Sequence, residues 1–317
     1  MGPSIEKQSG PFSLVNVSYC PLCKSHRLRQ MFKVRHTTGD PQHDCGLELG
    51  FARAGIVSCS GCGFVFKAQQ PSGAYLDSHY AESGKDYLAS LAEEDSGIRE
   101  DFRTARKLLM KRFPNGATIV DVGCASGFFL ESLGDTWTRF GVELFRFAAE
   151  QARRRRGITV HEGDLFSAGF AMHSLDVVCS FDVIEHLSDP MSLFREARRI
   201  LKPGGLLVLG TGDSRSFAAR LSGSRWTYFC IPEHLSFFNS ASLRRGLKKT
   251  GFPHLRFERI HHGERSRSVA TAWVRAVGKH RAIELFGNSV LRWRLFRQKT
   301  DEFLVPYFFD HMICVAS

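Results

Sequence analysis

Long hydrophobic runs are missing from this sequence of 317 residues, although 43% of its residues are hydrophobic. No stretch approaches the roughly 18 to 20 apolar residues of a membrane-spanning helix, and the N-terminus lacks the apolar core of a signal peptide. No internal repeat or low-complexity tract is visible either. We therefore expect a cytoplasmic chain without a transmembrane segment, in which one main α/β domain carries a smaller appendage.

Acidic residues are scarce toward the C-terminus. Residues 211–317 contain 18 Lys and Arg but only 8 Asp and Glu, so +10 of the net charge of +11 belongs to this last third. Such a basic surface fits nucleic acid, a phosphorylated or nucleotide-linked substrate, or an anionic membrane that the protein touches peripherally. Charge alone does not choose among these partners.

The number of cysteines is odd, which argues against a framework in which every cysteine forms a disulfide. The nine present include two pairs spaced C-x-x-C, namely Cys20, Cys23, Cys59 and Cys62. Two such turns supply the four thiolates of a tetrahedral zinc site, which holds a fold together and does no chemistry. We predict a zinc-ribbon-like module over residues 1–70, with His43 and Cys45 as alternative ligands, in a reducing compartment.

Strand and helix patterns alternate after a polar connector, residues 71–115, which becomes helical from residue 98 to residue 110. The predicted strands are 118–122, 138–143, 159–162, 175–181 and 206–211. The predicted helices are 128–133, 147–156 and 191–201. Strands interleaved with helices indicate an α/β fold, with a parallel sheet covered on both faces.

The same domain, residues 116–317, continues in a less regular way. After an irregular stretch rich in Ser and Arg, the pattern predicts a helix at 242–250, a strand at 255–260, a basic helical insertion at 266–299 and a last strand at 311–316. We expect residues 213–240 and 266–299 to form the substrate wall, because loops beyond strand ends carry specificity. The insertion mixes cations with aromatic residues, which suits a phosphate-bearing partner, a membrane surface or a stacked base, unless its tryptophans simply pack inward.

A glycine turn joins the first predicted strand to the helix that follows. Asp121, Gly123 and Gly127 lie at its start and end, while Ala125 stands where a third glycine would be. Such turns present backbone N–H groups and a helix N-terminus to a nucleoside-bearing cofactor. Glu143 ends the next strand, 20 residues after Gly123, where a carboxylate accepts hydrogen bonds from both ribose hydroxyls.

Three more motifs follow in order: Glu162-Gly-Asp164-Leu165, Phe181-Asp182-Val-Ile-Glu185-His186 and Lys202-Pro-Gly-Gly. Together with the glycine turn they make residues 117–260 and the final strand resemble the class I S-adenosylmethionine-dependent methyltransferases. This resemblance implies a Rossmann-like seven-stranded sheet with an antiparallel last strand.

The resemblance also implies roles for single residues. The methionine part of S-adenosylmethionine would lie against Asp121, Gly123, Ala125 and Gly127. Glu143 would hold the ribose, Asp164 and Leu165 would flank the adenine, and Phe181 and Asp182 would line the pocket. The blander alternatives are a helix cap for Asp164 and a surface charge for Glu143.

The paired cysteines and the segment 226–238 narrow this resemblance to bacterial methyltransferases of sugars, polysaccharides and natural products. Among these are sugar C-methyltransferases whose Glu-His pair matches Glu233 and His234. We predict His234 as general base, oriented by Glu233, unless the pair only pins a loop. His186 is a second candidate base or a residue that caps a helix, and Tyr228 binds substrate, moves a proton or packs in the core.

The sequence thus predicts S-adenosylmethionine-dependent methyl transfer to a small molecule or glycan, chiefly to a hydroxyl, with nucleotide- or lipid-linked sugars among the acceptors. Two rivals stay open. One is an RNA methyltransferase, supported by the zinc module and the basic last third, although the base-modifying signature Asn-Pro-Pro-Tyr is absent after the fourth strand. The other is a zinc-containing binding protein with an inactive methyltransferase core.

Overall fold

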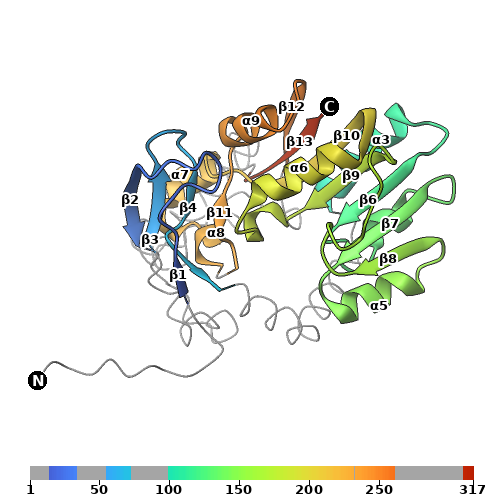
Figure 1. The fold of residues 1–317 in the computed structure, drawn as a ribbon, viewed down its shortest axis with the longest axis horizontal. Coiled ribbons are helices and arrows are strands. Elements are labelled where there is room, and N and C mark those ends of the chain that lie inside the picture. Colours follow the sequence, from blue (N-terminus) through green and yellow to red (C-terminus); the bar gives the residue numbers. More distant parts are fainter. Residues whose placement is uncertain (1–13, 34–54, 73–98, 232, 261–309) are drawn as a thin grey trace, which may run out of the picture.

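The computed structural model describes residues 14–33, 55–72, 99–231, 233–260 and 310–317 (Figure 1). Its largest element is a seven-stranded sheet with the order β12-β13-β10-β9-β6-β7-β8. The strands are β6 (Thr118–Val122), β7 (Thr138–Glu143), β8 (Ile158–Glu162), β9 (Leu175–Phe181), β10 (Leu201–Gly212), β12 (Leu255–Ile260) and β13 (His311–Ala316). The last of these runs antiparallel to both of its neighbours, as the resemblance implies.

Two layers of helices cover this sheet, because its central strands are apolar on both faces. Val177 of β9 packs in one cluster with α3 (Glu100–Arg112), α4 (Phe128–Ser132) and α5 (Arg146–Arg154). Val178, its neighbour, packs in the other cluster with α6 (Pro190–Ile200) and α9 (Ser240–Lys249). The α/β fold class is therefore confirmed, and the strands at 118–122, 138–143, 175–181, 255–260 and 311–316 have the predicted bounds.

Local capping explains where the later helices begin. Asp189 accepts a hydrogen bond from the Met191 N–H ahead of Pro190, the first residue of α6. A reciprocal capping box between Asn239 and Ser242 starts α9 two residues earlier than periodicity predicts. Side-chain caps thus fix helix starts that apolar spacing alone places only approximately.

The N-terminal module contributes β2 (Leu28–Lys33), β3 (Gly55–Cys59) and β4 (Val65–Lys67) to a second, antiparallel sheet. Its fourth strand, β11 (Ser236–Phe237), comes from far along the chain and pairs with β4. A separate pair joins β1 (Leu14–Asn16) to β5 (Gln69–Pro71). The module therefore shares a sheet with the segment that follows β10. This sheet extends beyond the module as predicted, which ends at residue 70.

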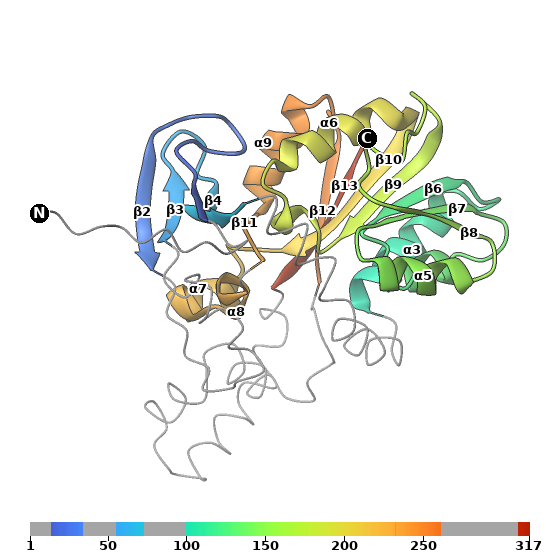
Figure 2. The ribbon, with the colours of Figure 1, turned by 60° about the horizontal axis from the view of Figure 1, so that its bottom comes forward.

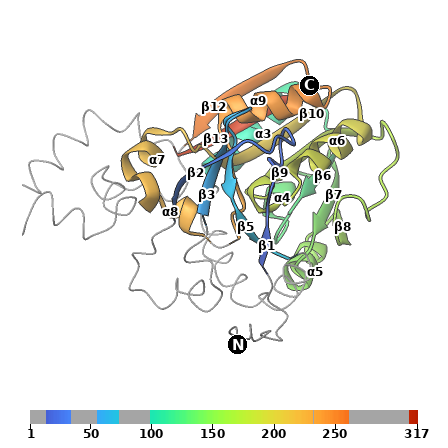
Figure 3. The same cartoon turned by 60° about the vertical axis from the view of Figure 1, so that its left-hand side comes forward.

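The module also packs against α9. A Cβ added at Gly246 of α9 would lie 2.9 Å from Leu22 Cδ1, so glycine there allows the two parts to approach closely. Figures 2 and 3 show β2, β3 and β4 gathered near α7 (Phe217–Ser222) and α8 (Thr227–Cys230), with β7 and β8 at the other end of the molecule.

These short helices, with the 3-10 turn η4 (Gly223–Arg225), occupy the stretch that the sequence pattern leaves irregular. Helices of four to six residues show too few turns for a periodicity to be recognised. The insertion 266–299, most of the connector, His43 and Cys45 lie outside the described residues. Among the described helices, none has the length and apolar character that crossing a bilayer requires.

Candidate functional site

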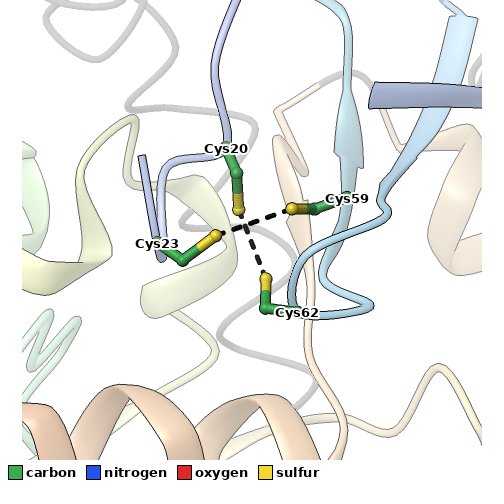
Figure 4. Close-up of side chains that lie close together, drawn as sticks. All are labelled: Cys20, Cys23, Cys59 and Cys62. Carbon is green, nitrogen blue, oxygen red and sulfur yellow. Dashed lines mark hydrogen bonds between the residues drawn. The ribbon is translucent and has the colours of Figure 1, made fainter. Parts of the chain in front are cut away.

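Four cysteine sulfurs converge between the two turns of the N-terminal module (Figure 4). The Cys20 and Cys62 sulfurs lie 3.5 Å apart, as do those of Cys23 and Cys59. Disulfides would need S–S distances near 2.05 Å, whereas a tetrahedral site with bonds of about 2.3 Å places its sulfurs about 3.8 Å apart. The four sulfurs are therefore spaced closely enough to hold one tetrahedral metal ion, and no disulfide joins them.

The turns that carry these cysteines supply N–H groups to sulfur. The backbone N–H of Gly61 donates to Cys59 Sγ at 3.3 Å. Burial acts to raise the pKa of Cys59, but hydrogen bonds from the backbone of Cys62 and Gly61 outweigh it and lower the pKa to about 7. Burial raises the pKa of Cys62 to about 11. At least one ligand is thus held close to its thiolate form, the form that binds metal.

The glycine turn between β6 and α4 has the left-handed backbone conformation that its glycines suggest. Gly123, Ala125 and Gly127 all have positive φ, so the alanine occupies a left-handed position that glycine would adopt without cost. A Cβ at Gly123 would lie 2.3 Å from Val183 Cγ2, in the loop after β9. Two loops therefore meet where β6 and β9 lie side by side and the strand order changes direction, which is where open α/β sheets bind ligands.

Buried carboxyl groups lie along the same edge of the main sheet. Asp121 is 2% exposed, and burial raises its pKa to about 8. Glu143 is 4% exposed, which excludes the surface-charge alternative. Its two oxygens accept hydrogen bonds from the backbone N–H groups of Ala125 at 2.8 Å and Phe145 at 2.9 Å. Burial nevertheless raises the pKa of Glu143.

The third and fourth strands end at the same edge of the sheet. Asp164 accepts a hydrogen bond from the Ser167 N–H at 2.7 Å, which lowers its pKa and closes a turn, and no helix begins at this point. Leu165 is buried beside it. Phe181 is buried against the ring of Phe129. The structure thus brings together all the residues predicted to hold the cofactor, along the carboxyl ends of β6, β7, β8 and β9.

Asp182 stands at the switch between strands with a positive φ of 53°. Its carboxylate pairs with the Arg99 guanidinium and lies 3.5 Å from His311 Nε2. Burial opposes protonation of His311, but hydrogen bonds to Asp182 and Asp310 outweigh it and raise its pKa to about 10. Sequence reasoning missed Arg99 and His311, because the residue before α3 and the first residue of β13 become neighbours of Asp182 only in the folded chain, with β13 paired to β10.

Three of the residues predicted to do chemistry, His186, Tyr228 and His234, lie together with Glu185 near the end of β10. Glu185 lies in the turn η3 (Ile184–His186), is fully buried, and contacts the Tyr228 hydroxyl. Thr211 Oγ1 donates to its other oxygen at 3.0 Å. Burial raises the pKa of Glu185 to about 7. Any side chain at Gly212 would collide with the Tyr228 ring, since an added Cβ lies 2.6 Å from it.

His234 packs beside this pair. Its ring centroid lies 4.0 Å from that of Tyr228 and 4.8 Å from that of His186. Nδ1 lies 3.1 Å from the Tyr228 carbonyl oxygen, so this nitrogen donates its proton and Nε2 keeps the lone pair. The Tyr228 carbonyl therefore orients the ring, and the negative charge of Glu233 acts on His186.

Both imidazoles are neutral near pH 7, because burial lowers the pKa of His186 and lowers that of His234 further. The positive charge of Lys67 adds to the effect at both rings. Sequence reasoning missed Lys67, the last residue of β4, because its apolar strand pattern gives no hint of a buried cation.

Comparisons with known proteins agree with this architecture. A family model described as "Methyltransferase domain" matches residues 95–255. A ubiquinone biosynthesis O-methyltransferase of Cereibacter sphaeroides is 30% identical over 133 residues, which cover 37% of this chain and 51% of that protein. In Mycolicibacterium smegmatis, a protein named "Probable S-adenosylmethionine-dependent methyltransferase" is 28% identical over 172 residues, covering 54% of this chain and 64% of that protein.

The chain therefore spans about half the length of the first of these relatives. Among solved structures, a chain of the complex between the Haloferax volcanii Trm112 methyltransferase activator and a methyltransferase matches with a TM-score of 0.52 and 22% identity. The match covers 74% of this chain and 96% of that one, and it supports the fold alone.

Proposed function

Because this chain belongs to the methyltransferase domain family, among the S-adenosylmethionine-dependent enzymes, we propose that it transfers a methyl group to a hydroxyl of a small molecule or glycan. The observation that carries this proposal is the meeting of Glu185, Tyr228 and His234 at the sheet edge that also carries the glycine turn. The O-methyltransferase relative supports oxygen as the accepting atom. Sugars, nucleotide-linked or lipid-linked among them, are the acceptors that we expect.

Cofactor binding in this proposal uses the residues along the strand ends. Each Glu143 oxygen accepts one backbone hydrogen bond, and a carboxylate oxygen has two lone pairs, so both oxygens keep capacity for the ribose hydroxyls. The turn around Ala125 would accommodate the methionine part, and Asp164 with Leu165 would flank the adenine. When bound, S-adenosylmethionine supplies an electrophilic methyl group.

Proton removal falls to His234 in this mechanism. Nε2 carries the lone pair, because the Tyr228 carbonyl binds the other ring nitrogen. Burial keeps the imidazole neutral and therefore able to accept the proton that the acceptor hydroxyl loses during attack. Glu185 and Tyr228 would hold the acceptor in line with the breaking bond, and this alignment supplies most of the rate gain.

Zinc is the ion that we propose for the four cysteines, since thiolates in a closed tetrahedral set favour it. Because protein fills all four positions, the ion would brace the fold without touching the acceptor. The described cysteines outside this set, Cys124, Cys179 and Cys314, are free thiols, which supports a reducing, cytoplasmic compartment.

The test is to incubate the zinc-loaded protein with cofactor carrying a labelled methyl group and pools of sugar nucleotides, lipid-linked glycans and RNA. We expect the methyl mass to appear on a glycan hydroxyl. Label on RNA would favour the nucleic-acid alternative. Binding of S-adenosylhomocysteine without label on any pool would favour the inactive core.

A further inference from the structure

Lys67 places a buried cation at the junction of the two sheets. Its side chain is 1% exposed, although it ends a strand of the N-terminal module. Lysine is almost never fully buried unless its charge is paired, because removing an ammonium from water is costly. The burial of the Lys67 ammonium group therefore requires an explanation other than packing.

Its hydrogen bonds hold one turn at both ends. Lys67 Nζ donates to the carbonyl of Ile231 at 2.6 Å, and its backbone N–H donates to the carbonyl of Leu235 at 2.9 Å. The N–H of Leu235 donates in turn to the carbonyl of Glu185 at 2.8 Å. The backbone on the two sides of His234, at Ile231 and at Leu235, is thus held between the module and the turn that carries Glu185.

The charge of Lys67 acts on the imidazoles that this turn brings together. It opposes protonation of both His186 and His234, and each of the two rings also lies in the field of Asp182. Among the described residues, Glu185, Tyr228 and Glu233 are further titratable groups beside the pair.

We propose that Lys67 is a positioning residue, through which the N-terminal module holds the backbone at Ile231 and Leu235, on the two sides of His234, and keeps the imidazole pair unprotonated. This inference rests on the proposed function, because it gives the module a part in proton removal.

A competing interpretation of the same cluster is a second metal site. The donor atoms of Glu185, His186 and His234 lie within 4.8 Å of one another. A divalent ion there would meet the charge of Lys67 and would have to compete with two hydroxyl groups for Glu185. The contacts of Lys67 therefore favour two neutral imidazoles that can accept protons over a metal-binding site.

The test replaces Lys67 with methionine, which keeps the length and removes the charge, and with glutamine, which keeps a hydrogen-bond donor. Without the cation both imidazoles protonate more readily, so the acid limb of the pH profile of kcat/KM should move upward by about 1 pH unit in both variants. Glutamine should lose less turnover than methionine at high pH, since it still binds the turn. Lys202→Met, which removes a lysine paired with Asp176, is the matched control and should leave the profile in place.

A second measurement does not depend on activity. The Cε1–H signals of His186 and His234, followed by NMR against pH, should shift their midpoints upward in Lys67→Met, and affinity for S-adenosylhomocysteine should stay within threefold. If the midpoints move but no acceptor is methylated, the role proposed for Lys67 is supported and the proposed function is wrong. Unchanged midpoints in both variants, or a second equivalent of metal bound beyond the one held by the cysteines, would overturn the role of Lys67.

Discussion

The cofactor edge and the acceptor edge of the proposed active site are built in opposite ways. On the cofactor edge, the glycine turn, Glu143, Asp164 and Asp182 follow successive strands, and each is placed by its own strand end. On the acceptor edge, Lys67 and His234 come from segments 167 residues apart and meet only because β11 pairs with β4. The first edge is local in sequence, whereas the second depends on the N-terminal module.

The strongest test of this difference removes the metal centre. Cys59→Ser should release the metal and unfold the module, because structural zinc sites contribute about 10 to 16 kcal/mol in small zinc-dependent folds. Turnover should fall by about 100-fold or more, since the His234 turn loses its support. Calorimetry should still show S-adenosylhomocysteine binding within threefold.

Ser60→Ala, at an exposed position beside Cys59, serves as the control and should change neither metal content nor turnover. Parallel loss of cofactor affinity in Cys59→Ser would show that the two edges are not independent.

A sharper change on the acceptor edge is His234→Gln. Losing a positioned general base typically costs about 10² to 10⁴ in rate, and we expect a fall in kcat of that size with cofactor affinity unchanged. His254→Gln, an exposed histidine next to β12, should behave as wild type. Steady-state kinetics with saturating cofactor decide the matter, and a variant that retains full turnover rules His234 out as the base.

On the cofactor edge, Glu143→Ala should weaken S-adenosylhomocysteine binding by about 1 to 3 kcal/mol, through lost charge-assisted hydrogen bonds. Turnover at saturating cofactor should change less than in His234→Gln. The control is Glu162→Ala, the residue paired with Glu143 on β8. Equal losses of affinity in both variants would move the ribose site away from Glu143.

The smallest effect concerns pH and stability where the two edges meet. The pKa of His311 is about 10 in the fold and about 6.5 when exposed, so its contribution is fully present below pH 6.5 and is lost as pH rises toward 10. We expect the free energy of unfolding to fall steadily over this window. Asp310→Asn should flatten the dependence in urea titrations, and a slope that is unchanged in this variant would contradict the assignment.

The amino-acid sequence was most informative where chemistry and secondary structure repeat along the chain. Asp121, Gly123 and Glu143 were recognisable because a strand, a tight turn and a carboxylate at the next strand end form one local pattern. The resemblance points to Glu233 and His234, but it does not give the groups around the His234 ring, because the Tyr228 carbonyl and the Glu185 carboxyl approach that ring only in the folded chain. Arg99, His311 and Lys67 carry no local signal at all.

The sequence by itself determined the parallel sheet, the glycine turn and the paired cysteines, because strand period, backbone conformation and ligand spacing are properties of neighbouring residues. Only the tertiary structure decided which groups face one another across the crevice. The charge state of His234 depends on burial and on Lys67, and the protonation of His311 depends on two carboxylates brought from elsewhere in the fold. Electrostatic interactions act through space, so their partners follow from packing and not from order along the chain.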